Sequence, residues 1–291
     1  MKKFILLTFL VYQSIHIAAQ DSSKEDSKAT EWFGYLAQNE GNYLLAIKHF
    51  SEALSIDSTL LYLYLDRAIC YKQLKKYDAA IKDLKRLVEL NIRYVDSAYY
   101  NLGNIYRDMK YYDMAIMNYK KAIAINNSHY QVYYNMANTY YDQQKYLDAI
   151  YNYKKSISIN SNYSKPYYNL AIVYQNLMEF DKSIEYYTKY LQKVDTIKDI
   201  ENIVRANLNC GLLYLKIKNY EKSISHFKSI LKYYNKKDIQ DINIEDIYYN
   251  LAISYYYKKE YSEACKYVKI LKNINSEYDN IEYMIKDMCR N

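Results

Sequence analysis

Apolar residues recur along most of the chain with the spacing of amphipathic helices, and polar residues lie between them. From residue 27 to residue 278, apolar side chains recur three and four residues apart in segments of about 14 residues, which is the period of a helix that buries one face. Only 4 Gly and 1 Pro occur in 291 residues, and this argues against sandwiches and barrels, which need such residues at many turns. The pattern predicts an all-α protein.

Pairs of these helical segments repeat at a spacing of 34 residues. The phrase AYYNLGNIYRDMKYYDMAIMNYKKAIAIN, for example, returns as VYYNMANTYYDQQKYLDAIYNYKKSISIN. The register gives seven copies: 27–60, 61–94, 96–129, 130–163, 164–197, 204–237 and 245–278. Neither helix of a copy can bury its apolar face alone, so we expect neighbouring copies to stack into one continuous core.

The positions that must be small or aromatic agree between the copies. Position 8 is always small: Gly34, Ala68, Gly103, Ala137, Ala171, Gly211 and Ala252. Position 20 is also small: Ala46, Ala80, Ala115, Ala149, Ser183, Ser223 and Ala264. Position 17 is Phe180 in one copy and Tyr in the other six. Small residues are needed where two helices cross closely.

This pattern resembles the tetratricopeptide repeat (TPR), a helix-turn-helix unit of 34 residues, over residues 27–278. The resemblance implies an all-α TPR solenoid, a right-handed superhelix whose first helices line a concave surface with positions 2, 5, 6, 9, 12 and 13. Two departures are the missing Pro at position 32 and the missing Trp at position 4. Residues 279–291 are predicted to form a helix that caps the end of the stack, and the additional residues 198–203 and 238–244 are predicted to form longer loops.

A row of Asn and Tyr residues falls on the expected concave surface. Position 6 is Asn101, Asn135, Asn169, Asn209 and Asn250, and position 9 adds Asn104 and Asn138. Position 5 is Tyr100, Tyr134, Tyr168 and Tyr249. An Asn amide can both donate to and accept from a peptide backbone, and Tyr offers a large contact area with a polar end. The row looks like the asparagine ladder of O-GlcNAc transferase and would bind an extended peptide; alternatively, it only packs the repeats.

A second resemblance is to the carboxylate clamp of TPR domains that bind chaperone C-termini. Asn104, Asn135 and Lys165 match its pattern, whereas Tyr100 and Asn169 replace a Lys and an Arg. Because most of the charge-assisted hydrogen bonding would be lost with those two cations, we do not expect a chaperone clamp.

The N-terminus predicts export. Lys2 and Lys3 precede an apolar run, and small residues follow at Ala18 and Ala19, as in a secretory signal peptide. Residues 1–19 are therefore predicted to be a signal peptide, and 20–30 a flexible polar lead-in. The expected location is periplasmic or extracellular. An uncleaved signal that anchors the chain to a membrane is the alternative.

Composition and candidate chemistry point away from an enzyme. The net charge of +7 is spread over residues of both signs, which does not favour nucleic-acid binding. The His and Cys residues show no metal-binding spacing, and no phosphate-binding Gly loop or nucleophile motif is present. We expect no catalytic residues, cofactor or metal.

Two cysteines, Cys265 and Cys289, could be neighbours across the last helix pair. Buried free thiols are nevertheless the favoured interpretation for them and for Cys70 and Cys210.

The sequence thus predicts a non-catalytic scaffold that binds a protein or peptide partner. The alternative is an accessory subunit of a cell-envelope secretion or assembly complex. Neither the partner nor the oligomeric state follows from the sequence.

Overall fold

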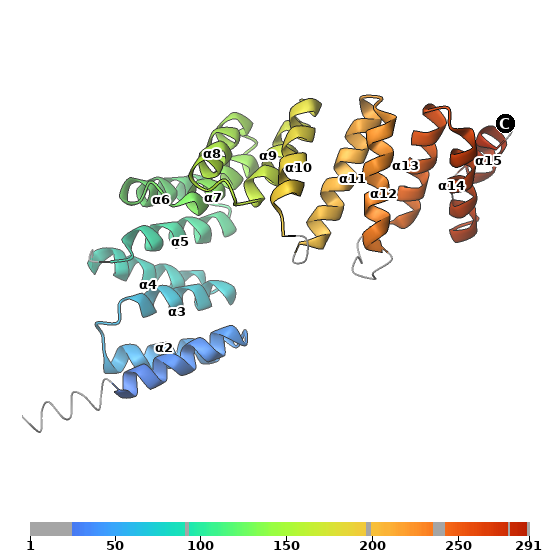
Figure 1. The fold of residues 1–291 in the computed structure, drawn as a ribbon. Helices are drawn as coiled ribbons and strands as arrows, with labels where there is room; N and C mark the ends of the chain where they lie inside the picture. The colour runs from blue at the N-terminus through green and yellow to red at the C-terminus, as the bar shows by residue number, and fades with distance from the viewer. Residues whose placement is uncertain (1–24, 91–92, 196–198, 235–241, 279, 290–291) are drawn as a thin grey trace, which may run out of the picture. The chain divides into compact units, whose positions relative to one another are not determined.

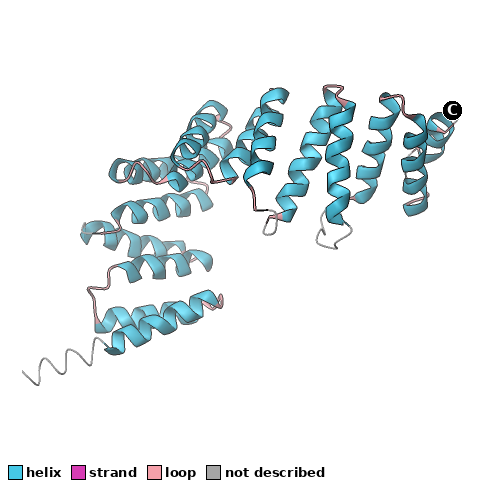
Figure 2. Cartoon of the chain, in the orientation of Figure 1, coloured by secondary structure: helices cyan, strands magenta, loops and turns pink. Residues whose placement is uncertain are grey.

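The computed structural model describes residues 25–90, 93–195, 199–234, 242–278 and 280–289, and within these ranges its regular elements are all helices (Figure 2). A helical segment at residues 25–39 comes first. The helices that follow are α2 (Tyr43–Ile56), α3 (Tyr62–Gln73), α4 (Tyr77–Leu90), α5 (Val95–Asp108), α6 (Tyr112–Ile125), α7 (Tyr130–Asp142), α8 (Tyr146–Ile159), α9 (Lys165–Asn176), α10 (Phe180–Lys193), α11 (Ile200–Lys216), α12 (Tyr220–Tyr234), α13 (Ile244–Tyr257), α14 (Tyr261–Ile274) and α15 (Ile281–Met288). The fold is an all-α TPR solenoid, drawn in Figure 1.

The chain divides into two compact units, Met1–Gln144 and Lys145–Asn291. The boundary falls in the turn between α7 and α8. Within each unit, buried apolar side chains of consecutive helices form the core. In unit 2, for example, one cluster joins Phe227 of α12, Leu251 of α13 and Met284 of α15.

Three sequence expectations concern the N-terminus and the start of α11. The expected signal peptide, residues 1–19, lies outside the described residues. Residues 25–30, which we expected to belong to a flexible lead-in, are helical. Residues 200–203, which we expected in a longer loop, instead form the first turn of α11. In that turn Ile203 is 3% exposed, so burial of an apolar side chain accounts for the extension of the helix.

Close packing between the two helices of a repeat explains the small residue at position 8. Gly103 faces the ring of Tyr119, which is fully buried, and a Cβ at Gly103 would lie 2.4 Å from the Tyr119 ring. The same approach recurs at Gly34 against Phe50 and at Gly211 against Phe227. A larger residue at position 8 would push the second helix away.

The turn between the paired helices has the same backbone in every repeat. Position 15 has a positive φ throughout: Gly41, Lys75, Lys110, Gln144, Met178, Lys218 and Lys259. The following N–H returns to the first helix, as in the bonds from Tyr111 N to Tyr106 O and from Glu179 N to Tyr174 O. This is a Schellman cap, which satisfies the last carbonyls of the helix.

The second helices end without the Pro that is usual at position 32. In four repeats a side-chain oxygen at position 31 accepts the backbone N–H two residues later, and these residues are Asp57, Asn126, Asn160 and Asn275. Such a local bond offers the chain an alternative to the helix. It replaces Pro as the stop signal.

The cysteines correct part of the sequence interpretation. Cys265 of α14 and Cys289, which follows α15, form a disulfide across 24 residues, whereas a pair of free thiols was favoured. Cys70 and Cys210 are free and buried, as predicted. The disulfide ties the terminal helix α15 to the last helix pair.

Candidate functional site

A hydrogen-bonded cluster joins α5 and α7 in unit 1. The side-chain N–H groups of Asn135 donate to Tyr100 Oη at 2.9 Å and to Asn104 Oδ1 at 2.8 Å. Tyr119 Oη, from α6, donates to the same Asn104 oxygen at 2.8 Å. Four residues of three helices thus share one network. It forms because positions 5 and 9 of one first helix face position 6 of the next.

Burial shapes the electrostatics of this network. Burial raises the pKa of Tyr100, although hydrogen bonds to Asn104 and Asn135 lower it. His129, whose ring lies 5.0 Å from that of Tyr100, has its pKa lowered by burial. Both groups are therefore neutral near pH 7, and the network presents hydrogen-bonding groups rather than charge.

The position-6 Asn residues of unit 2 are held in a similar way. Asn209 donates from Nδ2 to Tyr187 Oη at 2.8 Å. Asn250 donates to Asp246 O, one turn earlier in its own helix, at 2.7 Å. The same local bond, at 2.9 Å, joins Asn101 to Ser97 O in unit 1. The N–H groups of these amides thus donate to other groups of the protein itself.

The carbonyl oxygens of these amides have no such partners. Within the described residues, the Oδ1 atoms of Asn101, Asn135, Asn209 and Asn250 accept no hydrogen bond. They are also absent from the buried unpartnered atoms, which are His129 Nδ1, Gln143 Oε1 and Asn152 Oδ1. Four acceptors at position 6 of their repeats are therefore open to solvent, two in each unit.

The remaining predicted site residues differ in exposure. Tyr134, Tyr168, Asn169 and Tyr249 are half-buried, Asn138 is buried, and Lys165 is exposed. Tyr168 packs its ring edge-to-face on Tyr187 and Tyr190, with centroids 5.5 and 5.1 Å apart. Asn104 and Asn135, the two asparagines of the chaperone-clamp pattern, are joined to each other. Those groups are therefore engaged in unit 1 itself.

Charged residues of the first helices pair between neighbouring repeats. Lys72 lies 3.2 Å from Asp108, and Arg107 lies 2.8 Å from Asp142. These residues are at positions 12 and 13 of consecutive copies. In each pair the positive and negative charges neutralise each other. The first helices of unit 1 therefore carry no unpaired cation at positions 12 and 13.

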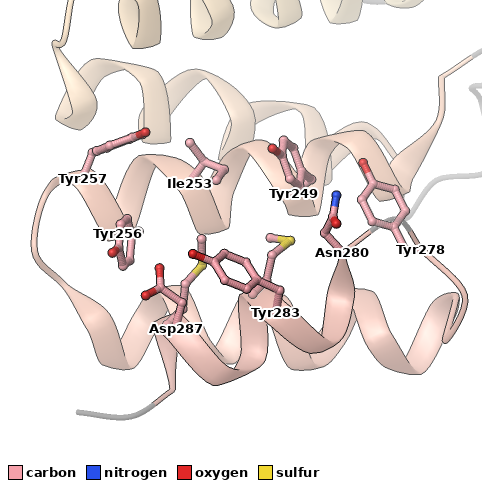
Figure 3. A pocket seen from close by; sticks show the side chains of 10 residues that line it. Tyr249, Ile253, Tyr256, Tyr257, Tyr278, Asn280, Tyr283 and Asp287 are labelled. Carbon is pink, nitrogen blue, oxygen red and sulfur yellow. The ribbon is translucent and has the colours of Figure 1, made fainter.

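Unit 2 contains a pocket that the sequence did not reveal. It lies between α13 and α15, has a volume of about 650 Å³, and is lined by five Tyr residues and Asp287 (Figure 3). Tyr249 was predicted as a site residue; the other four are Tyr256, Tyr257, Tyr278 and Tyr283. One signal was available, because continuing the spacing of 34 residues beyond 278 puts Tyr283 at position 5.

The described residues contain neither a cluster of metal ligands nor a membrane-spanning helix. No group of three or more His, Cys, Asp or Glu side chains there could hold a metal ion. None of the helices in the part of the chain that the structure describes is long and apolar enough to cross a membrane.

Comparison with known proteins identifies the repeats. A family model described as "TPR repeat" matches residues 103–144 and 137–177, and one described as "Tetratricopeptide repeat" matches residues 61–91 and 164–192. No curated protein sequence matches the chain. Proteins built from these repeats are generally non-catalytic scaffolds that bind protein or peptide partners.

Solved structures share the fold at low sequence identity. The C-terminal part of a TPR repeat-containing protein from Cytophaga hutchinsonii is 17% identical, with a TM-score of 0.66, over 87% of this chain and 98% of that one. PilF of Pseudomonas aeruginosa is 17% identical, with a TM-score of 0.60, over 75% and 94%. YrrB, described as a TPR protein with an unusual peptide-binding site, is 18% identical, with a TM-score of 0.55, over 70% and 97%.

Proposed function

We propose that this chain is a non-catalytic scaffold that binds an extended segment of a partner protein along the concave surface that the first helices form within each unit. The observation that carries the proposal is the row of solvent-accessible Asn oxygens. Each unit has two of these oxygens, those of Asn101 and Asn135 in unit 1 and those of Asn209 and Asn250 in unit 2. Each oxygen can accept a backbone N–H of the partner.

The fixed orientation of the amides supports this role. Asn135 has both of its N–H groups held by neighbouring side chains, so its oxygen is already directed before a partner arrives. A group that is held in its bound orientation loses little conformational entropy on binding. The row would accept N–H groups from any sequence, and the half-buried Tyr residues at position 5 would add contact area.

We also propose that the chain is exported to the periplasm or the extracellular space. The signal-like residues 1–19 support this proposal, and so does the disulfide between Cys265 and Cys289, because disulfides persist mainly in oxidising compartments. N-terminal sequencing of the protein isolated from its native host tests the proposal. A chain that begins near Gln20 is expected; a full-length chain in the cytoplasmic fraction would contradict export.

Substitution of two asparagines tests the binding surface. Asn101→Ala and Asn250→Ala each remove an acceptor and only one hydrogen bond, which lies within the same helix, so the fold should be retained. We expect the double variant to lose at least tenfold in the recovery of a specific partner. The measurement is cross-linking followed by capture from the native envelope fraction, with quantification by mass spectrometry.

A matched control distinguishes binding from folding. Asn118→Ala removes the same kind of intrahelical bond, to Met114 O at 2.8 Å, but on a second helix. This control should capture the partner at the wild-type level, and circular dichroism should give all variants the same helix content. Equal capture by the double variant and the wild type would mean that the asparagine row only packs the repeats.

A further inference from the structure

The last groove between first helices in the described chain differs from the groove between α5 and α7. In the α5–α7 groove, Asn104 at position 9 and Asn135 at position 6 bond to each other across the groove. Helix α15 stands in the place of an eighth first helix, and there the matching residues are Ile253 and Met284. These apolar side chains cannot form that bond. The space between α13 and α15 therefore remains an open pocket of about 650 Å³, a size typical of ligand sites.

The walls of this pocket are mainly aromatic. Five of its ten lining residues are Tyr, and none is basic. Tyr249 and Tyr278 lie at one end with centroids 5.8 Å apart, Tyr256 and Tyr257 lie at the other, and the Tyr283 ring lies between them (Figure 3). The Tyr283 ring is 69% exposed. Aromatic faces carry negative electrostatic potential and attract cations.

Negative charge lies at both ends of the pocket. Asp287 lies beside Tyr256 (Figure 3), and its negative charge raises the pKa of that phenol. At the other end Tyr278 Oη donates to Asp246 Oδ1 at 3.2 Å. Two basic residues of unit 2 pair with other carboxylates: Lys272 with Glu282 and Lys258 with Glu260. Both carboxylates thus lack a cationic partner among the ion pairs of the described residues.

The pocket has firm walls. The disulfide between Cys265 and Cys289 fixes the end of α15 immediately after Asp287 and Met288. Met284 and Met288 are each 5% exposed and form part of the floor. A site held in place in this way loses little free energy to ordering when a ligand binds.

We propose that this pocket binds an arginine side chain of the partner protein, with the guanidinium stacked on the Tyr256 and Tyr283 rings and paired with the Asp287 carboxylate. Arginine fits this chemistry better than lysine because its planar group both stacks on aromatic faces and bonds carboxylates in a bidentate way. The inference rests on the proposed scaffold function and adds a charged side-chain anchor to a surface whose hydrogen bonds otherwise go to the partner's backbone. It also predicts that the bound segment carries a basic residue near this end of the solenoid.

The test uses N-acetylarginine amide as a probe and its neutral isostere N-acetylcitrulline amide as the comparison. The full chain, labelled with ¹³C at the Met methyl groups, is titrated while NMR follows the signals of Met284 and Met288, which line the pocket. We expect saturable shifts with a dissociation constant in the millimolar range, and at least tenfold weaker binding of the citrulline compound. Equal binding of the two compounds, or no shift of these methyl groups, would overturn the proposal.

Two carboxylate variants on α15 complete the experiment. Asp287→Asn should weaken binding of the arginine probe about tenfold, whereas Glu282→Gln, which changes the same charge outside the pocket lining, should leave it unchanged. Asn101→Ala must not affect the probe. If the asparagine variants lose partner capture but the wild type binds no probe, the arginine site is refuted and the scaffold function stands. If the probe binds but the wild type captures no partner, the scaffold function is refuted and the arginine site stands.

Discussion

The residue at position 15 turns the chain between the two helices of each repeat, and in six of seven copies it is not glycine. Its φ lies between 56° and 77° throughout. For residues other than Gly this conformation costs roughly 1–2 kcal/mol. The chain thus contains a strained residue in every repeat except the first, where Gly41 fills the position.

Glycine substitution at this position should stabilise the protein. Met178, with a φ of 58° and a side chain that is 76% exposed, makes little contact that could be lost. We expect Met178→Gly to raise the free energy of unfolding by about 0.5–1 kcal/mol, because relief of strain exceeds the greater chain entropy of glycine. Urea denaturation followed by circular dichroism measures the difference.

The reverse change at Gly41 provides the matched control. A Cβ at Gly41 would meet nothing within 4 Å, and its φ is 77°, so only the backbone conformation is tested. Gly41→Ala should lower the free energy of unfolding by about 1 kcal/mol. If both variants were less stable than the wild type, side-chain contacts at position 178 would outweigh the backbone strain.

Residue types along the first helices were predictable, but the partners of their side chains were not. The repeat register put Asn101, Asn135, Asn209 and Asn250 at position 6 of their first helices. The register cannot tell whether an amide bonds within its own helix, as Asn101 does, or across helices, as Asn135 does. That choice depends on rotamers and on the neighbour at position 9, which differs between copies.

At the scale of the helices, one pair of positions carries a buried ion pair where most repeats have an uncharged pair. Arg67 donates from Nε and Nη2 to the two oxygens of Asp83 at 2.8 and 2.7 Å, and from Nη1 to Ser51 Oγ at 3.0 Å. The side chains of Arg67 and Asp83 are 16% and 8% exposed. The repeat at 96–129 has Leu102 and Asn118 at the same two positions. The fold therefore accepts either solution.

Replacing the ion pair with the Leu–Asn pair should distinguish the cost of an unpaired buried charge from the cost of burying these two side chains. Asp83→Asn alone leaves the Arg67 charge without its anionic partner and should lower the free energy of unfolding by about 3–5 kcal/mol. The double variant Arg67→Leu/Asp83→Asn should lie within about 1 kcal/mol of the wild type, since it copies a pair that the chain already uses. Denaturant unfolding of the four proteins of this cycle gives the coupling energy. A double variant no more stable than Asp83→Asn would contradict the argument.

Helix ends were less predictable than helix existence. The 34-residue register located both helices of each repeat because apolar periodicity and small residues at positions 8 and 20 act together. It missed the stop signal at Asn126 and its equivalents: Asp or Asn recurs at position 31, but the sequence does not show that the side chain accepts the backbone N–H two residues later. It also missed the extension of α11 to Ile200, where apolar residues fell in a presumed loop.

At the scale of the molecule, the end of the solenoid is where sequence and structure differ most. A stack of repeats loses its cooperative neighbours at its ends, so terminal helices open with the smallest free energy. The disulfide between Cys265 and Cys289 joins α15 to α14 across 24 residues. The register could place these cysteines near each other, but it could not show that their geometry allows a bond. This bond also holds one wall of the pocket between α13 and α15.

Counting thiols in the protein from its native host tests this bond and bears on export at the same time. Without reductant, two of the four cysteines should react in denaturant, because Cys70 and Cys210 are free; after reduction, all four should react. Removal of the bond by Cys265→Ala/Cys289→Ala should cost ~3 kcal/mol by loop entropy and speed amide hydrogen exchange in α15 first. Cys70→Ala, which removes a buried thiol in unit 1, should destabilise the chain without faster exchange in α15. Four reactive thiols before reduction would mean that the native compartment keeps the pair reduced, and the firm wall of the pocket would then depend on packing of Met284 and Met288 alone.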